Sequence, residues 1–354
     1  MRLDEISDFI FITVQQILRA VCDGRRRMIM DGIKKKIRWK DPGRLREAPK
    51  NFHCTEIVED GDVGTIRFTC TVPPGDECLV FSCRGRSVGM LVKGEEPAEE
   101  NVEMEFEKVD VNFFDSGYTL AGMTGFQIWS ASRLLMEVLT WSSPSSSNNN
   151  YYNQTIVGAK IIELGSGIGV VGTSLAYAGG HVLLTDLPTL VENAVIPNLY
   201  QNSTQNNASD NTHWKDAIPI GKGWASAQPL DWTKPLSAEH DDTMENIDFI
   251  IASDCVWLTS MFHALMDTVV AIFERSPNAT FLLSFQQRNT TTSSSMFTSI
   301  DSILETLVVQ HGWKVQCIAW RPIYQNDSDN DGNDKTEEQI PVFVLEIQQS
   351  TNTK

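Results

Sequence analysis

Apolar residues follow two different spacings along the second half of the chain, and the two alternate. Short continuous runs such as Ile161-Ile162 and Val182-Leu183-Leu184 are typical of strands buried on both faces, whereas longer stretches repeat apolar residues every three or four positions, as helices do. This alternation predicts an α/β, doubly wound, Rossmann-like fold with a mostly parallel sheet. The predicted strands are 160–164, 181–185, 224–228, 247–252, 280–285, 313–319 and 341–347, and the predicted helices are 126–136, 168–179, 190–200, 261–273 and 297–311.

The first part of the chain has a different pattern of apolar and charged residues. Residues 4–22 carry an apolar stripe at helical spacing, and the basic runs 25–27 and 34–38 follow. Such runs serve as nuclear-import or membrane-surface signals in some proteins, but a solvated helix face is the commoner explanation. Residues 51–116 contain short β-type pieces between turn signals, which predicts a small β-rich cap. We therefore divide the chain into a basic amphipathic segment 1–50, a cap 51–116 and a main domain 117–348.

The chain is strongly acidic. Its formal net charge is −17 and its isoelectric point is near 4.8, and because residues 1–50 carry +6, the remainder carries −23. Phosphate contacts need a basic face, so this balance argues against a nucleic-acid partner and favours basic protein surfaces. The seven cysteines form no CxxC pair and the six histidines are dispersed, so we expect no metal site and reduced thiols. With no signal peptide or membrane anchor, the protein is predicted to be a cytoplasmic monomer that needs no membrane, with the nucleus as the alternative location.

One glycine-rich stretch, Glu163-Leu164-Gly165-Ser166-Gly167-Ile168-Gly169-Val170-Val171-Gly172, ends a predicted strand and leads into a helix. Closely spaced glycines there place bare backbone N–H groups at a helix N-terminus, where a cofactor can approach closely. The next strand ends in Asp186, about twenty residues after the glycines, where a carboxylate can accept both hydroxyls of a ribose. The stretch therefore predicts half of a nucleoside-cofactor site.

Two cofactor classes use such a site. Gly167, Gly169 and Gly172 satisfy the dinucleotide pattern GxGxxG, which alone is a weak signal. Glu163 comes two positions before the first glycine, and a carboxylate there would repel a pyrophosphate but suits the charged amino acid tail of S-adenosylmethionine. We therefore favour S-adenosylmethionine. The alternative is a purely structural turn whose glycines only permit close packing.

Other chemistry-bearing residues also follow predicted strands. Besides Glu163 and Asp186, these are Trp232, Ser253 and Asp254. Ligands of a doubly wound sheet bind at the carboxyl ends of its strands beside the topological switch point, so we expect these side chains to converge. Asp254 has a second interpretation as the N-cap of the helix 261–273, although it lies several residues early for that.

At these positions the sequence resembles the class I, seven-β-strand S-adenosylmethionine-dependent methyltransferases, and within them lysine methyltransferase family 16, the methyltransferase-like protein 21 type. The resemblance covers residues 117–347 and implies a seven-strand sheet. The segments that carry it are Gly125-Phe126-Gln127-Ile128-Trp129-Ser130-Ala131-Ser132, Glu163-Leu164-Gly165-Ser166-Gly167-Ile168-Gly169, Thr185-Asp186-Leu187-Pro188, Leu230-Asp231-Trp232 and Ser253-Asp254-Cys255-Val256-Trp257.

The resemblance also implies roles for individual residues. The cofactor-binding set is Trp129, Glu163, Gly165, Ser166, Gly167, Gly169, Asp186, Trp232 and Ser253. In that set Trp129 and the glycines would border the methionine part, Asp186 would hold the ribose, and Trp232 and Ser253 would flank the adenine and the sulfonium. The family has an aromatic residue, usually Tyr or Phe, three positions after its acid; Trp257 keeps the ring here but lacks the phenol hydroxyl. A helix-capping core aromatic is the alternative interpretation of Trp257.

The implied reaction is methyl transfer to a lysine side chain of a protein substrate. For an in-line displacement the enzyme mainly has to position a neutral amine about 3 Å from the methyl carbon. A lysine ammonium must first lose its proton, so Asp254 would orient the amine and Trp257 would accept the cationic product. The alternative is a catalytically weak methyltransferase fold that acts as a scaffold or interaction protein. No GxSxG elbow or catalytic Tyr/Lys pair supports a hydrolase or a reductase.

Overall fold

The computed structural model describes residues 38–39, 52–60, 63–70, 79, 81–82, 125, 129–140, 155–204, 214–236, 243–256, 258–287, 299–324 and 339–350. The predicted helix 4–22, the basic run 25–27 and Trp257 lie outside these residues. Within them, no helix combines the length and the apolar character that a membrane crossing requires.

A nine-stranded sheet with the order β1-β11-β12-β10-β9-β5-β6-β8-β7 forms the body of the fold. Apart from β1 and β7 at its edges, the strands are parallel except β12, which is antiparallel to both β10 and β11. The expected doubly wound α/β sheet with seven principal strands is therefore confirmed. In spatial order these strands are β8 (Gly223–Pro229), β6 (His181–Asp186), β5 (Lys160–Leu164), β9 (Phe249–Ser253), β10 (Thr280–Gln286), β12 (Gln339–Gln348) and β11 (Lys314–Tyr324).

The sheet also has two edge strands that the apolar pattern did not predict. β7 (Ile218–Ile220) pairs antiparallel with β8, and β1 (Arg38–Trp39) pairs parallel with β11. Strands of three and two residues are too short to show an alternation of their own, so only their pairing defines them. Arg38 and Trp39 thus lie at the edge of the sheet that is formed by β11.

Three strands, two long and one of two residues, make a second sheet in the predicted cap. β2 (Phe52–Asp60), β3 (Val63–Cys70) and β4 (Phe81–Ser82) are antiparallel and lie in that order. The β-rich character expected for this region is confirmed there, while the domain boundaries stay a prediction. Leu79 and Phe81 are buried in the same apolar cluster as the helices of the main sheet. The two sheets therefore share one core at this point.

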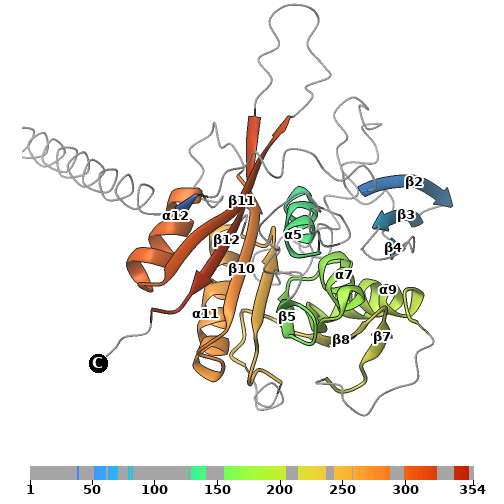
Figure 1. The fold of residues 1–354 in the computed structure, drawn as a ribbon, viewed down its shortest axis with the longest axis horizontal. Coiled ribbons are helices and arrows are strands. Elements are labelled where there is room, and N and C mark those ends of the chain that lie inside the picture. Colours follow the sequence, from blue (N-terminus) through green and yellow to red (C-terminus); the bar gives the residue numbers. More distant parts are fainter. Residues whose placement is uncertain are drawn as a thin grey trace, which may run out of the picture.

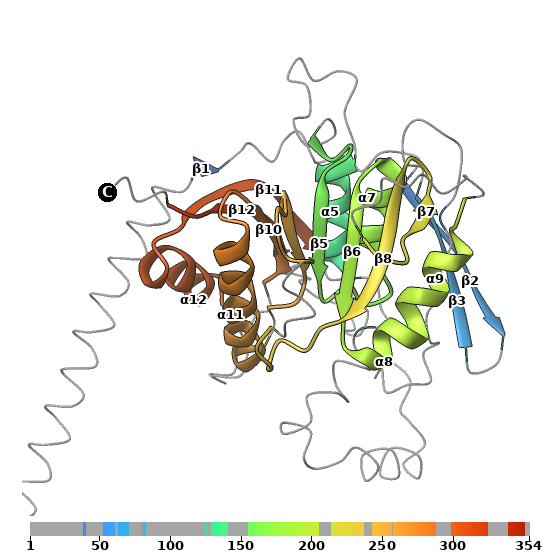
Figure 2. The same cartoon turned by 90° about the horizontal axis from the view of Figure 1, so that it is seen from below.

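Helices cover both faces of the main sheet (Figure 1). α5 (Ser130–Thr140), α7 (Val170–Ala178) and α9 (Ile196–Gln201) pack on one face, and α11 (Thr259–Arg275) and α12 (Ile300–Leu304) pack on the other. Figure 2 shows the two groups on opposite sides of the strands. Alternate residues of each strand supply the two cores, as the period of a strand requires.

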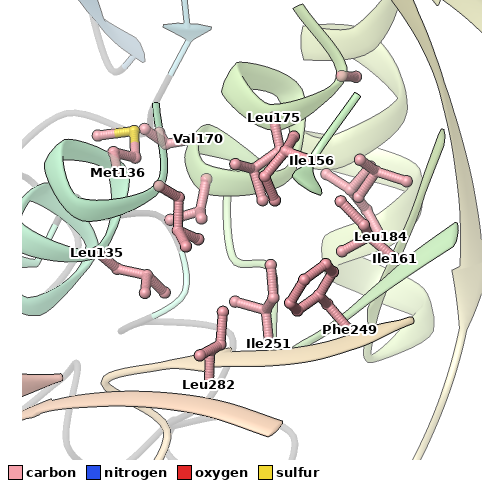
Figure 3. Close-up of a cluster of buried hydrophobic side chains, with 14 of the residues drawn as sticks. Leu135, Met136, Ile156, Ile161, Val170, Leu175, Leu184, Phe249, Ile251 and Leu282 are labelled. Atoms are coloured by element: carbon pink, nitrogen blue, oxygen red, sulfur yellow. The ribbon is translucent and has the colours of Figure 1, made fainter. Parts of the chain in front are cut away.

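The core between the sheet and α5 and α7 is shown in Figure 3. Ile161, Leu184 and Ile251 point from three neighbouring strands toward Met136 and Leu175 of the helices. Their strand neighbours in sequence point to the opposite core, which contains Ile162, Leu183 and Ile250. Because a slip of one residue would exchange the two sets, this burial fixes the register of the strands. The register in turn fixes which residues end each strand.

Two predicted helices contain π-helical turns. The predicted helix 190–200 is built from α8 (Pro188–Leu190), η2 (Val191–Val195) and α9, and the predicted helix 297–311 continues from α12 into η3 (Glu305–Gln310). In η2 the Ile196 N–H donates to the Val191 carbonyl five residues back. Pro197 follows at once and has no N–H to donate, so a wider turn here spares a clash with the preceding turn.

Candidate functional site

The glycine loop, residues 165–169, follows β5 directly. Gly165, Gly167 and Gly169 have φ angles of 71°, 57° and 82°. This left-handed conformation costs residues with a Cβ about 1–2 kcal/mol each, which explains the choice of glycine. The N–H groups of Gly165 and Ser166 donate to the Thr185 carbonyl oxygen at 2.9 and 3.0 Å, so the loop is fastened to the end of β6.

Two side chains that follow other strands, Cys255 and Trp232, pack closely against Gly165. A Cβ at Gly165 would stand 2.6 Å from the Cys255 Sγ and 3.0 Å from the ring of Trp232. The Cys255 thiol donates to the carbonyl oxygens of Leu164 at 3.3 Å and Ser253 at 3.2 Å. Cys255 lies within the segment Ser253-Asp254-Cys255-Val256-Trp257, but no role was predicted for it, because no spacing of residues in the sequence identifies a thiol that packs on a glycine.

Asp186 ends β6 beside the loop, as predicted. Its side chain is 9% exposed; Oδ2 accepts the Gly167 N–H at 2.8 Å and Oδ1 accepts the Leu187 N–H at 2.7 Å. Burial raises the pKa of Asp186 to about 6, although both backbone donors favour the charged form. Each carboxylate oxygen has two acceptor positions, so one on each remains after these bonds. The carboxylate therefore holds the loop and still has capacity for a diol.

Glu163 lies under the first turn of α7. Its side chain is 1% exposed, and Oε2 accepts the Gly172 N–H at 3.0 Å. The N-cap of α7 is Gly169, which has no side chain to cap the helix, so Glu163 supplies the acceptor from the strand below. Burial raises the pKa of Glu163 to about 8. This contact is one that sequence reasoning missed; a bond to the cofactor's amino group stays a prediction.

Asp254 directly follows β9 in an unusual conformation. Its φ is 54°, its side chain is 6% exposed, and Oδ1 accepts the Gln286 N–H at 3.3 Å. A left-handed aspartate is strained, and such residues cluster at functional sites. The N-cap of α11 is Leu258, so the alternative role of Asp254 as the cap of that helix is wrong.

A chain of three hydroxyls connects α5 to the ends of β9 and β10. The Ser284 hydroxyl donates to Ser253 Oγ at 3.1 Å, and the hydroxyls of Ser253 and Ser132 are 2.8 Å apart. Ser253 and Ser284 are buried, whereas Ser132 is partly exposed. Ser132 ends the predicted motif 125–132, and, as for Cys255, the sequence predicted no role for it.

The segment before α5 lies against the glycine loop. A Cβ on Gly167 would stand 2.7 Å from the Gly125 carbonyl oxygen. Trp129 immediately precedes α5, and its carbonyl oxygen accepts the N–H groups of Ser132 and Arg133 in the first turn. The structure thus brings Gly125, the first residue of the predicted motif, to the glycine loop, and it places Trp129 at the start of α5. Trp257 lies outside the described residues, so its role stays a prediction.

Three carboxyl groups surround one thiol at this edge. Burial raises the pKa of Cys255 well above its ordinary value, and the charges of Asp186, Asp254 and Glu163 raise it further. These acids come from β5, β6 and the turn after β9, which meet where the sheet reverses its strand order. The convergence expected from the sequence is therefore present in the geometry.

The residues present fit S-adenosylmethionine. The buried indole Nε1 of Trp232 has no hydrogen-bond partner among the described side chains and backbone groups, so this donor is left for a ligand. Asp186 offers acceptors for a ribose diol, and the glycine loop lets a ligand approach the backbone closely. The Asp186 carboxylate suits a cationic ligand better than a pyrophosphate.

A comparison with protein families gives one match over the region that contains the site. Residues 115–303, more than half of the chain, match the family described as lysine methyltransferase. This range contains the segment before α5, the glycine loop, Asp186, Trp232 and Asp254.

Several curated proteins are similar over part of their length. The chain is 29% identical to EEF1A lysine methyltransferase 3 of Mus musculus, over 44% of this chain and 59% of that protein. It is 27% identical to protein-lysine N-methyltransferase EFM6 of Saccharomyces cerevisiae, over 46% of this chain and 64% of that protein. It is 24% identical to histone-arginine methyltransferase METTL23 of Xenopus laevis, over 58% of this chain and 71% of that protein. The chain thus spans about three fifths of the first two relatives.

Proposed function

This chain belongs to the lysine methyltransferase family, and from that premise we propose that it transfers a methyl group from S-adenosylmethionine to a lysine side chain of a protein substrate. The observation that carries the proposal is the convergence of the glycine loop with Asp186, Glu163 and Asp254 at the switch point of the sheet.

Several residues of this site are suited to hold the cofactor. Asp186 would accept the ribose hydroxyls, the Trp232 Nε1 would donate a hydrogen bond, and Trp129 and the glycine loop would border the methionine part. When bound, S-adenosylmethionine supplies an electrophilic methyl group on a sulfonium. The protein's task is then to position the acceptor amine in line with that group and to exclude water.

Asp254 is the residue that we propose to orient the acceptor amine. Its backbone is held by a bond from its own N–H to the Ser284 carbonyl oxygen at 2.8 Å, and its carboxylate by the Gln286 N–H. A carboxylate held in this way can accept an N–H of the amine and direct the nitrogen lone pair toward the methyl carbon. Trp257, three residues later in the sequence, would receive the methylated cation on its ring.

The acceptor that we propose is a lysine on a basic protein surface. The charge of −23 outside residues 1–50 attracts such a surface and repels phosphate backbones. Two of the relatives are named as lysine methyltransferases and one as a histone-arginine methyltransferase, so the test must separate these acceptors. We further propose that the enzyme acts in the cytoplasm as a monomer; the free thiols of Cys255 and Cys317 support a reducing compartment.

The cofactor part of the proposal is tested by calorimetry with S-adenosylhomocysteine and with NAD. We expect binding of the former only, and a loss of about 1–3 kcal/mol in Asp186→Ala because two charge-assisted hydrogen bonds disappear. Binding should also weaken as the pH falls below about 6, where the Asp186 carboxylate becomes protonated. Binding of NAD without S-adenosylhomocysteine would refute the cofactor assignment.

The transfer part is tested with labelled S-adenosylmethionine and a lysate of the host, followed by mass spectrometry of the labelled proteins. We expect label on lysine, and its loss in Asp254→Ala with cofactor binding retained. Label on arginine or on RNA would refute the lysine assignment and leave the cofactor site intact. Cofactor binding without any labelled protein would favour a scaffold.

A further inference from the structure

An asparagine lies on the buried side of the helical segment 188–201. Residues Val191, Ala194, Val195 and Leu199 of this segment are buried at helical spacing, and Asn198, on the same side, is only 1% exposed. Its side-chain Nδ2 donates to the carbonyl oxygen of a residue thirty positions earlier, Ile168, at 2.9 Å. A buried amide at a core position needs such a partner, and here the partner lies in the glycine loop.

The peptide between Ile168 and Gly169 is held at both ends by this arrangement. Its carbonyl oxygen accepts from Asn198, and its N–H donates to the Ser166 carbonyl oxygen at 2.8 Å. The flanking residues Gly167 and Gly169 both have positive φ angles, and glycine adopts either sign of φ at little cost. Within the loop, the bond to the Ser166 carbonyl favours the observed orientation of this peptide, and the bond from Asn198 adds a second restraint from outside the loop.

The segment that carries Asn198 lies next to the same loop. A Cβ at Gly169 would stand 3.6 Å from the side chain of Val195 in η2. The π-type bond from the Ile196 N–H to Val191 precedes Pro197, and α9 with Asn198 follows immediately. Figure 2 shows α8 and α9 following each other along this side of the sheet. The helical segment 188–201 therefore contacts the glycine loop through Val195 as well as through Asn198.

We propose that Asn198 is a positioning residue of the cofactor site: its side-chain amide holds the glycine loop in the conformation that receives S-adenosylmethionine. The proposal rests on the proposed function for the identity of the ligand. Asn198 acts through the loop backbone, so its effect belongs to cofactor binding and to the mobility of the loop. The rate of transfer at saturating cofactor does not depend on it.

The test compares Asn198→Ala and Asn198→Leu with the matched control Asn193→Ala. Asn193 lies in the same segment but is exposed, and its Nδ2 donates to the Thr189 carbonyl within its own turn. Leucine keeps the space of Asn198 filled among apolar neighbours, but it removes the whole side-chain amide, both the Nδ2 donor and the Oδ1 acceptor. We expect both Asn198 variants to bind S-adenosylhomocysteine about tenfold more weakly, with KM for the cofactor raised and kcat within about twofold of the unmodified protein. Asn193→Ala should change neither.

Hydrogen exchange in the protein without cofactor gives a readout that is independent of activity. In both Asn198 variants the Gly169 amide should exchange faster, while the Gly172 amide, which donates to Glu163, should be unchanged. Unchanged exchange and affinity in a folded Asn198→Leu protein would overturn the proposal. So would loss of the fold in both Asn198 variants with Asn193→Ala intact, because the role would then be structural. If loop exchange responds but no variant transfers methyl groups, the proposed function fails and the positioning role stands.

Discussion

Two acids of the site show how burial and hydrogen bonds compete at single residues. Asp186 accepts two backbone N–H groups and Glu163 accepts one, and burial raises the pKa of both, to about 6 and about 8. Burial is the largest cause for both groups, and the negative charge of Asp186 raises the pKa of Glu163 further. Near neutral pH the two acids therefore differ, with Asp186 ionised and Glu163 mostly protonated.

The raised pKa of Glu163 makes the stability of the protein depend on pH. Its contribution is complete below about pH 4.5, where the group is protonated in both the folded and the unfolded chain, and is lost as the pH rises to about 8. The loss is on the order of 5 kcal/mol, because a tenfold change in proton affinity corresponds to about 1.4 kcal/mol. Glu163→Gln keeps an acceptor for the Gly172 N–H and has no proton to lose. We expect this variant to gain stability over the unmodified protein as the pH rises from 5 to 8, measured by urea unfolding.

The matched control is Glu192→Gln, since Glu192 is an exposed glutamate in η2. Its free energy of unfolding should follow that of the unmodified protein at every pH. An equal difference between Glu163→Gln and the unmodified protein at pH 5 and pH 8 would contradict the assignment of a buried, protonated Glu163.

At the residue scale, the sequence located the site but not its internal contacts. The ends of the strands, read from apolar runs, correctly brought Asp186, Ser253 and Asp254 to one edge. The partner of Glu163 was missed because Gly172 is nine residues away on a helix whose docking decides the contact. The left-handed backbone of Asp254 was also missed, because aspartate adopts this conformation more often than most residues but residue type alone does not say at which position.

At the scale of elements, α7 approaches the sheet unusually closely. A Cβ at Gly172 would stand 2.5 Å from Glu163 Oε2 and 2.8 Å from Leu184 Cγ. The glycine weakens the helix by about 1 kcal/mol relative to alanine, yet it lets β5 and β6 meet α7 without overlap. Close packing at this contact holds the first turn of α7 beneath the glycine loop.

Gly172→Ala tests this packing. The better helix propensity of alanine should be outweighed by overlap, which costs about 1–3 kcal/mol, so we expect a net loss of stability in thermal and urea unfolding. Gly312→Ala serves as a comparison, because nothing lies within 4 Å of a Cβ there and only its positive φ of 68° is unfavourable. A more stable Gly172→Ala protein would show that the helix moves freely away from the strands.

Helices and strands with a regular spacing of apolar residues were predicted from the sequence. Elements that exist only through pairing or packing with a neighbouring element were not. The principal strands, α7, α11 and the pair α12 and η3 agree with the apolar spacing to within about five residues, and α5 begins and ends four residues later than the predicted helix 126–136. β7 and β1 exist only through pairing, and the π-helical turns depend on Pro197 and on packing. Asn198 did have a sequence signal: it is a polar residue at a core position of the stripe Val191, Ala194, Val195 and Leu199.

At the scale of the whole molecule, the net charge bears on how the basic substrate that we propose would reach the site. The acidic body, at −23 outside the first fifty residues, attracts basic surfaces over about 10 Å at an ionic strength of about 0.1 M. The candidate site lies at the carboxyl ends of the central strands β5, β6 and β9. A partner must reach this end of the sheet before any local recognition begins. Under the proposed function, electrostatic attraction therefore affects how fast the substrate binds and not the rate of the methyl transfer step.

We expect kcat/KM for a basic acceptor protein to fall severalfold as the salt concentration rises from about 0.05 to about 0.3 M. The value of kcat at saturation and the dissociation constant for S-adenosylhomocysteine should change little. Steady-state kinetics with labelled cofactor gives these quantities. An equal decrease for a short acceptor peptide of zero net charge would attribute the effect to the enzyme's own stability and remove long-range attraction as its cause.

The place of β12 has a consequence for biosynthesis. This strand lies between β10 and β11, although it follows both of them in the chain. A nascent chain on the ribosome can pair β8, β6, β5, β9 and β10, but β11 has no neighbour to join on that side until β12 has been made. During this interval the growing sheet presents an unpaired edge, the feature that invites aggregation and chaperone capture. The cofactor half-site can therefore take shape during translation, whereas the sheet is completed only when one late strand inserts between two earlier ones.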